Sequence, residues 1–428
     1  MSRRSIWLGP PSMKRRRQAR ARACAAPAAR AVCAASPRAP NCTVPIRSRS
    51  RRDSSLIPSL SRPLGRMFRP PVRTDGRESC GVCRGSPCSG GVPSMRFALI
   101  GCTGHWTTYV PALKALPDLT LAAVAPATPE DSPATFERAA GVTGSTRRYR
   151  NPEQLLETEK LDFVQVCCRT DQGPVWTAAA LKRGLPVVAE KPLAMNLETL
   201  AALWKASEQT PLIPMHAQRG SGWLAAAQRA VAAGTIGKPL SSYHQKSYKW
   251  GATRPDWYRS RCTFAGLAPY AGIHAFDWVV WVLGSDWSEV SGWESSAARP
   301  EFPACAANGG YLLRGKDGQT AHVSVDYLRP AGAPTHGDER LRVAGTEGAL
   351  EMAPALDVRL LLRGGAEPEI LATPEPEDWY VSFVRRLRGE GESVIRRKEA
   401  FRATEIALKA QLAADTGRPQ SLAESTYI

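Results

Sequence analysis

The segment MRFALIGCTGHW, residues 95–106, decides the fold of this 428-residue chain. Its opening residues are mostly apolar, which predicts a buried strand that ends at Gly101. A helical segment follows the turn, with apolar residues spaced along one face. A strand that passes through a glycine turn into a helix is typical of the unit that holds a dinucleotide pyrophosphate on backbone N–H groups.

The glycine fingerprint of that unit, G-x-G-x-x-G, is degraded here. Thr103 and Trp106 stand at the second and third glycine positions, although Gly104 adds flexibility. Taken alone, the segment is interpreted equally well as a tight turn without a ligand. The acidic residue expected to bind the adenosine ribose is also missing, and Glu130 or Asp131 could replace it from the following loop. The choice between NAD and NADP stays open, with NAD slightly favoured.

Strand and helix signals alternate over residues 95–215. Apolar runs predict strands at 119–124, 163–168 and 186–189, and the segments between them have helical spacing. This alternation is the pattern of a parallel sheet wrapped by helices. We therefore predict an α/β domain, a doubly wound sheet of Rossmann type, for residues 95–215.

The tripeptide Glu190-Lys191-Pro192 follows one of these strands. A Lys held by a following Pro at the carboxyl edge of a parallel sheet points into the ligand crevice, and the alternative is a solvated Lys at a strand end. At this tripeptide the chain resembles the glucose-fructose oxidoreductase, inositol dehydrogenase and rhizopine-catabolism (Gfo/Idh/MocA) family, from Met95 to the C-terminus. In that family the tripeptide lies beside the nicotinamide.

The resemblance implies a nicotinamide cofactor, NAD or NADP, and a set of residues that bind it. The segment 215–219 resembles the family's arginine-ended strand, which lines the cleft between the domains. The cofactor-binding residues expected on this basis are Gly101, Thr103, Gly104, His105, Cys168, Arg169, Thr170, Glu190, Lys191 and Arg219.

The segment GIHAFD, residues 272–277, resembles the family's G-x-H-x-x-D helix. On a helix, His274 and Asp277 lie one turn apart, and an imidazole beside a carboxylate in an apolar helix is costly unless both have partners. A satisfied core histidine is the plainer interpretation. With the Glu-Lys-Pro tripeptide also present, we favour His274 as the general base, Asp277 behind it, and Lys191 as the donor that stabilises the alkoxide.

Tyr270 stands where many members of the family carry an Asp, four residues before the histidine. The proton relay is therefore altered. Either Tyr270 hydrogen-bonds the substrate as a catalytic residue, or efficient turnover is lost.

The segment 249–258 is dense in Trp, Tyr, Lys and Arg. Aromatic faces cover C–H surfaces and charged groups bind hydroxyls, so the segment suits a sugar or polyol, and a loop that caps the domain core is an equal alternative. The expected substrate residues are Trp250, Arg254, Trp257 and Tyr258. Strand alternation further on predicts a C-terminal α+β domain, residues 216–428, with a large, mostly antiparallel sheet. The resemblance implies that this domain binds substrate and forms a homo-oligomer, a dimer or tetramer, through its sheet.

These features predict a nicotinamide-dependent oxidoreductase, a dehydrogenase acting on a hydroxyl of a sugar, polyol or related small molecule. Two other classes remain. An NAD-dependent glycoside hydrolase uses the same fold, and nothing local in the sequence excludes it. A non-catalytic sugar or nucleotide sensor is supported by the degraded glycine fingerprint and by Tyr270.

Charge and composition exclude several other partners. The net charge of +18 lies at one end, because residues 1–94 hold 20 of the 57 basic residues and only 3 of the 39 acidic ones. The rest is nearly neutral, which argues against a nucleic-acid-binding body, and no apolar run is long enough for a membrane span. The five cysteines after residue 94 are scattered, which favours a reducing cytoplasm over a disulfide framework and offers no metal site.

Residues 1–94 have no burial pattern, so we expect them to be disordered, with translation starting at Met95. Three other interpretations are weaker. Residues 2–8 resemble a twin-arginine export signal but lack the apolar stretch that should follow, and the prolines oppose an organelle transit helix. Cys80, Cys83 and Cys88 lack a fourth zinc ligand.

Overall fold

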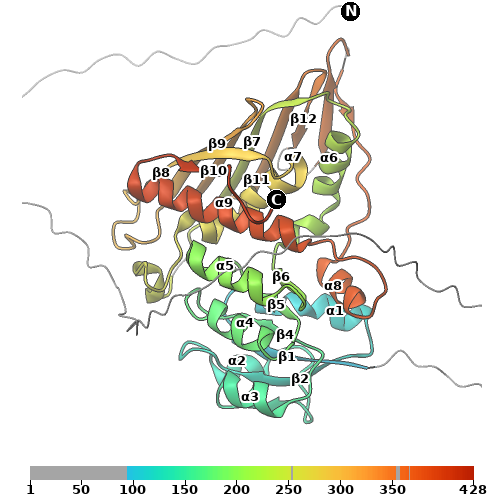
Figure 1. Cartoon of the computed structure of the whole chain (residues 1–428), viewed down its shortest axis with the longest axis vertical. Coiled ribbons are helices and arrows are strands. Elements are labelled where there is room, and N and C mark those ends of the chain that lie inside the picture. The colour runs from blue at the N-terminus through green and yellow to red at the C-terminus, as the bar shows by residue number, and fades with distance from the viewer. Residues whose placement is uncertain (1–93, 252–253, 353–356, 366) are drawn as a thin grey trace, which may run out of the picture. The chain divides into compact units, whose positions relative to one another are not determined.

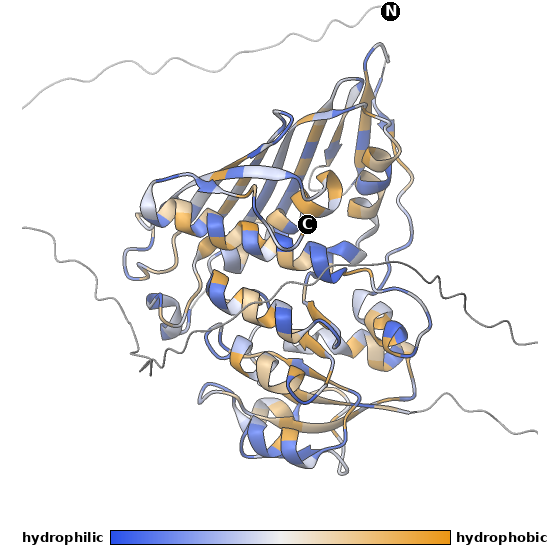
Figure 2. Ribbon diagram, viewed as in Figure 1, coloured by the Kyte–Doolittle hydropathy of each residue, from blue (hydrophilic) through white to orange (hydrophobic). Residues whose placement is uncertain are grey.

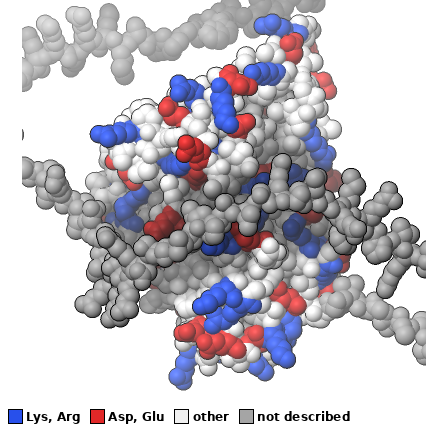
Figure 3. Space-filling model, in the orientation of Figure 1, with Lys and Arg blue, Asp and Glu red and all other residues white. Residues whose placement is uncertain are grey.

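The computed structural model describes residues 94–428, except 252–253, 353–356 and 366. The predictions about the N-terminal segment, including its disorder, its export or transit signals and its three spaced cysteines, lie outside the described residues. In the described part, Lys and Arg are interspersed with Asp and Glu on the face that Figure 3 shows. No helix of the described residues is long and apolar enough to cross a membrane.

Six parallel strands form the first sheet, in the order β3-β2-β1-β4-β5-β6 (Figure 1). Their bounds are β1 Met95–Ile100, β2 Leu119–Ala125, β3 Arg147–Arg148, β4 Phe163–Val166, β5 Val187–Ala189 and β6 Leu212–Pro214. The order reverses between β1 and β4, and ligands of such sheets bind at this switch point, outside the carboxyl ends of the strands. The predicted doubly wound sheet is confirmed.

Successive residues of β1 point to opposite faces of this sheet, as the strand period requires. Phe97 and Leu99 pack on the side of α1 and α8, whereas Ala98 and Ile100 pack on the side of α3, α4 and α5. Both faces are covered, so the strands read as continuous apolar runs. The helices and helical turns of this part are η1 Trp106–Tyr109, α1 Val110–Ala115, α2 Pro133–Glu137, α3 Pro152–Thr158, α4 Gly173–Leu181, α5 Leu197–Ala206 and α8 Trp379–Leu387.

Two of these helices begin at side-chain caps. The Asn151 carboxamide oxygen accepts a hydrogen bond from the Gln154 amide at 2.9 Å, and Asn196 accepts one from the Thr199 amide at 2.8 Å. Pro152 occupies the first position of α3, where no backbone N–H is needed. Both helices therefore begin where the sequence supplies an asparagine cap.

Nine strands form the second sheet, in the order β14-β13-β12-β11-β7-β10-β9-β8-β15 (Figure 1). Only β7 and β10 pair in parallel, so the prediction of a mostly antiparallel sheet is confirmed. The bounds are β7 Pro239–Lys249, β8 Trp287–Ser295, β9 Asn308–Gly315, β10 Thr320–Arg329, β11 Gly337–Gly345, β12 Gly348–Met352, β13 Val358–Leu362, β14 Glu369–Ile370 and β15 Gln420–Ser421.

Three helices cover one face of the second sheet: α6 Gly222–Ala232, α7 Ile273–Leu283 and α9 Arg397–Thr416. Helix α9 runs between the two sheets (Figure 1) and contributes Phe401 to the core of the first and Ile406 to the core of the second. Orange, apolar residues alternate with blue ones along α5 and α9 in Figure 2. Two short turns, η2 Ala217–Gly220 and η3 Asp256–Arg259, and the π-helical turn η4 Ala268–Gly272 complete the chain around the site.

Candidate active site

The loops after β1, β4 and β5 meet at one edge of the first sheet because parallel strands end on the same side. Gly101 has a positive φ of 77°, and a Cβ there would lie 2.4 Å from the Cys167 carbonyl oxygen. The Thr103 amide donates a hydrogen bond to that same oxygen at 2.9 Å. Only glycine permits this approach, so the first loop is held against the loop after β4.

Gly104 leaves room for the glutamate of the Glu-Lys-Pro tripeptide. Its φ is 71°, and a Cβ there would lie 2.5 Å from the Glu190 carboxylate. That buried carboxylate accepts hydrogen bonds from the His105 amide at 2.6 Å and the Lys191 amide at 3.1 Å, and the His105 imidazole lies 3.0 Å away. Burial raises the Glu190 pKa, but the His105 and Lys191 charges outweigh it and leave the pKa below its usual range. Glu190 therefore holds the loop after β1 against the loop after β5.

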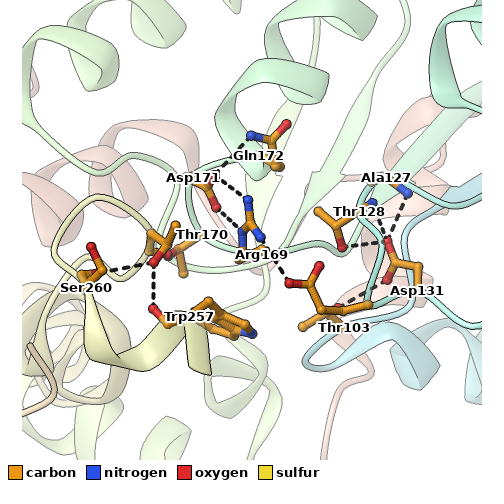
Figure 4. A network of polar contacts seen from close by, with 12 residues as sticks. Thr103, Ala127, Thr128, Asp131, Arg169, Thr170, Asp171, Gln172, Trp257 and Ser260 are labelled. Carbon is orange, nitrogen blue, oxygen red and sulfur yellow. Dashed lines mark hydrogen bonds and ion pairs between the residues drawn. The ribbon is translucent and has the colours of Figure 1, made fainter. Parts of the chain in front are cut away.

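Asp131 does not take the place of the missing ribose-binding acid. Its buried carboxylate accepts hydrogen bonds from the Cys102 amide at 2.8 Å and from the Ala127 and Thr128 amides, both at 2.9 Å. The Thr103 hydroxyl donates to it as well, at 3.2 Å. Figure 4 shows this carboxylate directed toward Thr103, Ala127 and Thr128, so Asp131 joins the loop after β1 to the loop after β2. Sequence reasoning considered Asp131 only as a ligand to the cofactor and missed this role.

The predicted cofactor residues after β4 also use their side chains within the protein. Arg169 forms an ion pair with Asp171 at 2.6 Å (Figure 4) and a second one with Glu130 at 3.0 Å. The Thr170 hydroxyl donates to the Thr263 carbonyl oxygen, and burial raises the pKa of the Cys168 thiol well above its usual value. The side chains of Arg169 and Thr170 are therefore engaged within the protein, and the prediction that the loop 168–170 binds a cofactor then rests on its backbone.

A cavity of about 370 Å³ opens beside this edge. It brings together residues predicted for both cofactor and substrate: Thr103, Gly104, His105, Lys191, Tyr270, His274, Arg254, Trp257 and Tyr258. Tyr248, Tyr327 and His336 also line it and were missed, because nothing in their local sequence distinguishes them from other strand or loop residues.

Lys191 enters this cavity from the loop after β5. Its side chain is buried, and Nζ donates a hydrogen bond to the Tyr270 carbonyl oxygen at 2.8 Å. The same Nζ lies 3.9 Å from the centroid of the Tyr270 ring. Burial, together with the Arg254 charge and against the Glu190 charge, lowers the pKa of Lys191 to about 8. The π-helical turn η4 thus supplies both a carbonyl and an aromatic face to this amine.

His274 lies in the first turn of α7 and reaches the cavity from the other side. Its ring centroid is 6.4 Å from that of His105 and 6.5 Å from that of His216. Burial, and then the charges of Lys191 and Lys246, hold the pKa of His274 well below its usual range. His274 is therefore neutral near pH 7 and able to accept a proton.

The expected contact between His274 and Asp277 is wrong. The Asp277 carboxylate instead lies 2.8 Å from His216 Nδ1 and accepts hydrogen bonds from Arg219 at 2.7 and 2.9 Å. Burial raises the Asp277 pKa, but Arg219 and His216 outweigh it and hold the pKa far below its usual range. Asp277 points into the protein because the buried guanidinium needs a negative partner.

The prediction that Arg219 lines the cleft is also wrong. It lies in η2 rather than on a strand, its side chain is fully buried, and it pairs with both Asp277 and Glu399. The segment 215–219 thus supplies His216 and Arg219, which bind Asp277 of α7. Neither Arg219 nor Asp277 is exposed to a ligand.

We expect Asp277→Asn to lower the free energy of unfolding by roughly 1–3 kcal/mol, because it removes the charge that the buried Arg219 requires. The effect on stability should shrink as pH falls, since the wild-type pair itself is lost when Asp277 is protonated. Chemical denaturation at neutral and acidic pH measures this. An unchanged free energy of unfolding at neutral pH would contradict the structural role.

The described residues of the aromatic segment 249–258 belong partly to the domain core and partly to the cavity wall. The Tyr258 and Tyr270 hydroxyls are hydrogen-bonded at 2.6 Å, and both rings pack with Phe264. The prediction of Trp250 as a substrate residue is not supported, because Trp250 is not among the residues that line the cavity. Its ring packs on Phe302 and Tyr327, with centroids 5.2 and 5.4 Å away.

Lys246 is a residue near the site that sequence reasoning missed. It is buried on β7, with Nζ 2.6 Å from Glu339 and 3.2 Å from the Gln218 carboxamide oxygen. Burial lowers its pKa to about 8. Its signal in the sequence was a Lys at an inward position of an alternating strand.

The fold and this cleft define an oxidoreductase with an NAD-binding Rossmann domain. Residues 95–217 match the family model described as the oxidoreductase family with an NAD-binding Rossmann fold, and residues 224–351 match that of the GFO/IDH/MocA C-terminal domain. The chain belongs to the Gfo/Idh/MocA family, which confirms the resemblance inferred from the sequence.

Named relatives are similar at low identity. The D-apiose dehydrogenase of Paraburkholderia graminis is 24% identical over 304 residues, which cover 67% of this chain and 75% of that protein. The myo-inositol 2-dehydrogenase of Thermotoga maritima is 27% identical over 199 residues, 46% of this chain and 57% of that protein. A solved structure from Thermotoga maritima with a provisional oxidoreductase name superimposes with a TM-score of 0.71 at 29% identity, covering 76% of this chain and all of the other.

Proposed function

We propose that this protein is a nicotinamide-dependent dehydrogenase that oxidises a hydroxyl group of a sugar, polyol or related small molecule. The observation that carries the proposal is that Lys191 and His274 line one cavity together with the Gly104-His105 turn of the Rossmann domain. Residues 95–215 would bind the cofactor, and residues 216–428 would bind the substrate and a second subunit. Its relatives named as sugar and inositol dehydrogenases support the same chemistry.

The cofactor edge fits a dinucleotide. The turn after β1 lies at the switch point of the first sheet, and the amides of Gly104 and Trp106 in this turn have no acceptor among the described residues, so they are able to donate hydrogen bonds to a pyrophosphate. A nicotinamide bound there would supply the acceptor for the hydride of the substrate carbinol carbon. The matching family model is NAD-binding, so we propose NAD rather than NADP.

Lys191 and His274 divide the work at the substrate oxygen. The Lys191 ammonium donates a hydrogen bond to this oxygen and stabilises the negative charge that develops on it. The neutral His274 imidazole takes the hydroxyl proton as general base. Tyr270 acts through Lys191, because its carbonyl and ring hold the amine while its hydroxyl is bonded to Tyr258.

The test is to mix the full chain with NAD, and separately with NADP, and a panel of sugars, polyols and aryl glycosides. Formation of reduced nicotinamide supports the dehydrogenase. Release of the aglycone with no net reduction would indicate a glycoside hydrolase, and binding with neither product would indicate a sensor. The last two outcomes would overturn the proposal.

We also propose that the protein is a cytoplasmic homo-oligomer. The face of the second sheet opposite its helices carries the exposed side chains Tyr243, Trp293 and Leu312, and Trp293 is 67% exposed. Apolar groups gathered on one sheet face favour association with a second copy. The five cysteines of the described residues are all unpaired, which fits a reducing compartment.

Trp293→Glu is expected to shift the protein toward monomer, because association would bury a charge on each copy at the same surface. Light scattering over a range of concentrations measures the mass. Ile370→Glu, another exposed apolar side chain on the edge strand β14, serves as the control and should leave the mass unchanged. A monomeric wild type would refute the oligomer, and an oligomeric Trp293 variant would refute this interface.

A further inference from the structure

We propose that the substrate carries a carboxylate group and that Arg254 binds it. This inference rests on the proposed dehydrogenase function and names its substrate class: a small polyhydroxy acid rather than a neutral sugar or polyol. Three independent features of the cleft support it. They are the charge of its lining, the surroundings of the Arg254 guanidinium, and the volume.

The lining of the cavity is basic. Lys191 and Arg254 contribute cations, His105, His274 and His336 contribute imidazoles, and no carboxylate belongs to the described lining. The nearest glutamate of the Lys191 loop, Glu190, is occupied by His105. Hydroxyl groups of a neutral sugar need acceptors as well as donors. A cleft whose described lining holds two cations and no carboxylate matches an anion better than a neutral molecule.

Arg254 has no ion-pair partner among the described residues. Its guanidinium carbon lies 4.6 Å from the centroid of the Tyr327 ring, 5.1 Å from that of Trp250 and 5.3 Å from that of Tyr258. Its Nε is buried and has no hydrogen-bond partner in the described structure. A buried donor without an acceptor is costly, and a bound carboxylate would remove this cost.

Arg219 and Arg402, which are buried, show how this protein treats a guanidinium that serves structure. Arg219 is paired with Asp277 and Glu399, and Arg402 is paired with Glu405 at 2.7 Å. Arg254 instead is half-buried and lies among three aromatic rings, which surround its guanidinium without neutralising it. A planar guanidinium is suited to bidentate binding of a carboxylate.

The position and size of the cavity restrict the ligand further. Arg254 and Lys191 line the same cavity, and the Arg254 charge is one of the causes that lower the pKa of Lys191. A carboxylate on Arg254 would therefore favour the ammonium form of Lys191, the form that stabilises the alkoxide. A volume of about 370 Å³ suits a single small hydroxy acid and is near the lower end for ligand sites.

The experiment compares pairs that differ only in a carboxylate against a hydroxymethyl group. These are D-glucuronate with D-glucose, D-galacturonate with D-galactose, and D-gluconate with D-sorbitol. For each compound, kcat/KM is measured with NAD, and the shift in thermal unfolding temperature is measured with NAD present. We expect an acid to exceed its neutral partner by roughly tenfold or more in kcat/KM, and to stabilise the protein where the neutral partner does not.

Two variants test whether Arg254 is the cause. Arg254→Gln should lower kcat/KM for the acid roughly 10- to 100-fold and abolish the thermal shift. Arg254→Lys should give a smaller loss, because the charge stays but the bidentate fork is gone, and it decides the matter if the Gln variant does not fold. Arg259→Gln is the matched control: Arg259 lies in the same loop and pairs with the exposed Asp256, so it should keep wild-type values.

The outcomes separate this inference from the dehydrogenase proposal. If the acids stabilise the protein through Arg254 but no reduced nicotinamide forms, the dehydrogenase proposal fails and the carboxylate site stands. If a neutral compound is oxidised as well as its acid, the dehydrogenase stands and the carboxylate site is overturned. The site is overturned also if no acid raises the unfolding temperature, or if Arg254→Gln leaves the preference for the acid intact.

Discussion

Lys191→Met is expected to lower turnover about a hundredfold or more, the usual effect of losing a donor to a developing oxyanion. Cofactor binding and folding should change little, because Met fills a similar volume and the Lys191 side chain makes its one described hydrogen bond to the Tyr270 carbonyl, on the wall of the cavity. Steady-state turnover, fluorescence titration with the cofactor and thermal unfolding measure the three quantities.

The same substitution should change the pH profile. The ammonium form of Lys191 is the one that stabilises the alkoxide, and its pKa of about 8 means that this form is lost as pH rises through that value. We therefore expect kcat/KM to fall on the alkaline side near pH 8 in the wild type and not in the Met variant. Lys205→Met on the exposed surface of α5 is the control. Wild-type turnover in Lys191→Met would refute the assignment.

His274→Ala is expected to lower turnover by roughly 10² to 10⁴, the range for loss of a general base. An unperturbed imidazole has a pKa of about 6.5, which would place the pH dependence of a His274 general base near neutrality. In the structure, burial and the nearby Lys191 and Lys246 charges hold the His274 pKa well below its usual range. The pH dependence due to His274 is therefore expected at a more acidic pH.

The acid limb of the wild-type profile should accordingly lie well below pH 6.5, where His274 becomes protonated and can no longer accept a proton. The Ala variant should lose this limb and keep the alkaline one. Turnover measured across the pH range, with Lys205→Met on the exposed surface of α5 again as the control, tests both points. A wild-type rate, or an acid limb that survives the substitution, would contradict the role of His274.

Much of the fold followed from local patterns. The apolar run 95–100 and the strand and helix signals after it predicted the doubly wound sheet, because residues buried on both faces of a parallel sheet must be apolar wherever they lie. The Glu-Lys-Pro tripeptide and the G-x-H-x-x-D segment likewise indicated Lys191 and His274, which the structure brings to one cavity. Lys191 follows the end of β5 and His274 lies at the start of α7, so the course of the backbone brings both side chains to the site.

The partners of the charged groups were decided only by the tertiary structure. Asp277 lies three residues from His274 on one helix, yet it pairs with His216 and Arg219, 61 and 58 residues away. Asp131, one of two residues that could have replaced the missing ribose-binding acid, instead joins the loop after β1 to the loop after β2. Arg254 lies among aromatic rings without a carboxylate partner in the described residues. A buried charge takes whichever opposite charge or donor the packed chain brings within a few ångströms. The periodicity of apolar residues in the sequence cannot predict these partners. It shows which face of a helix or strand is buried, but not which residues pack against that face.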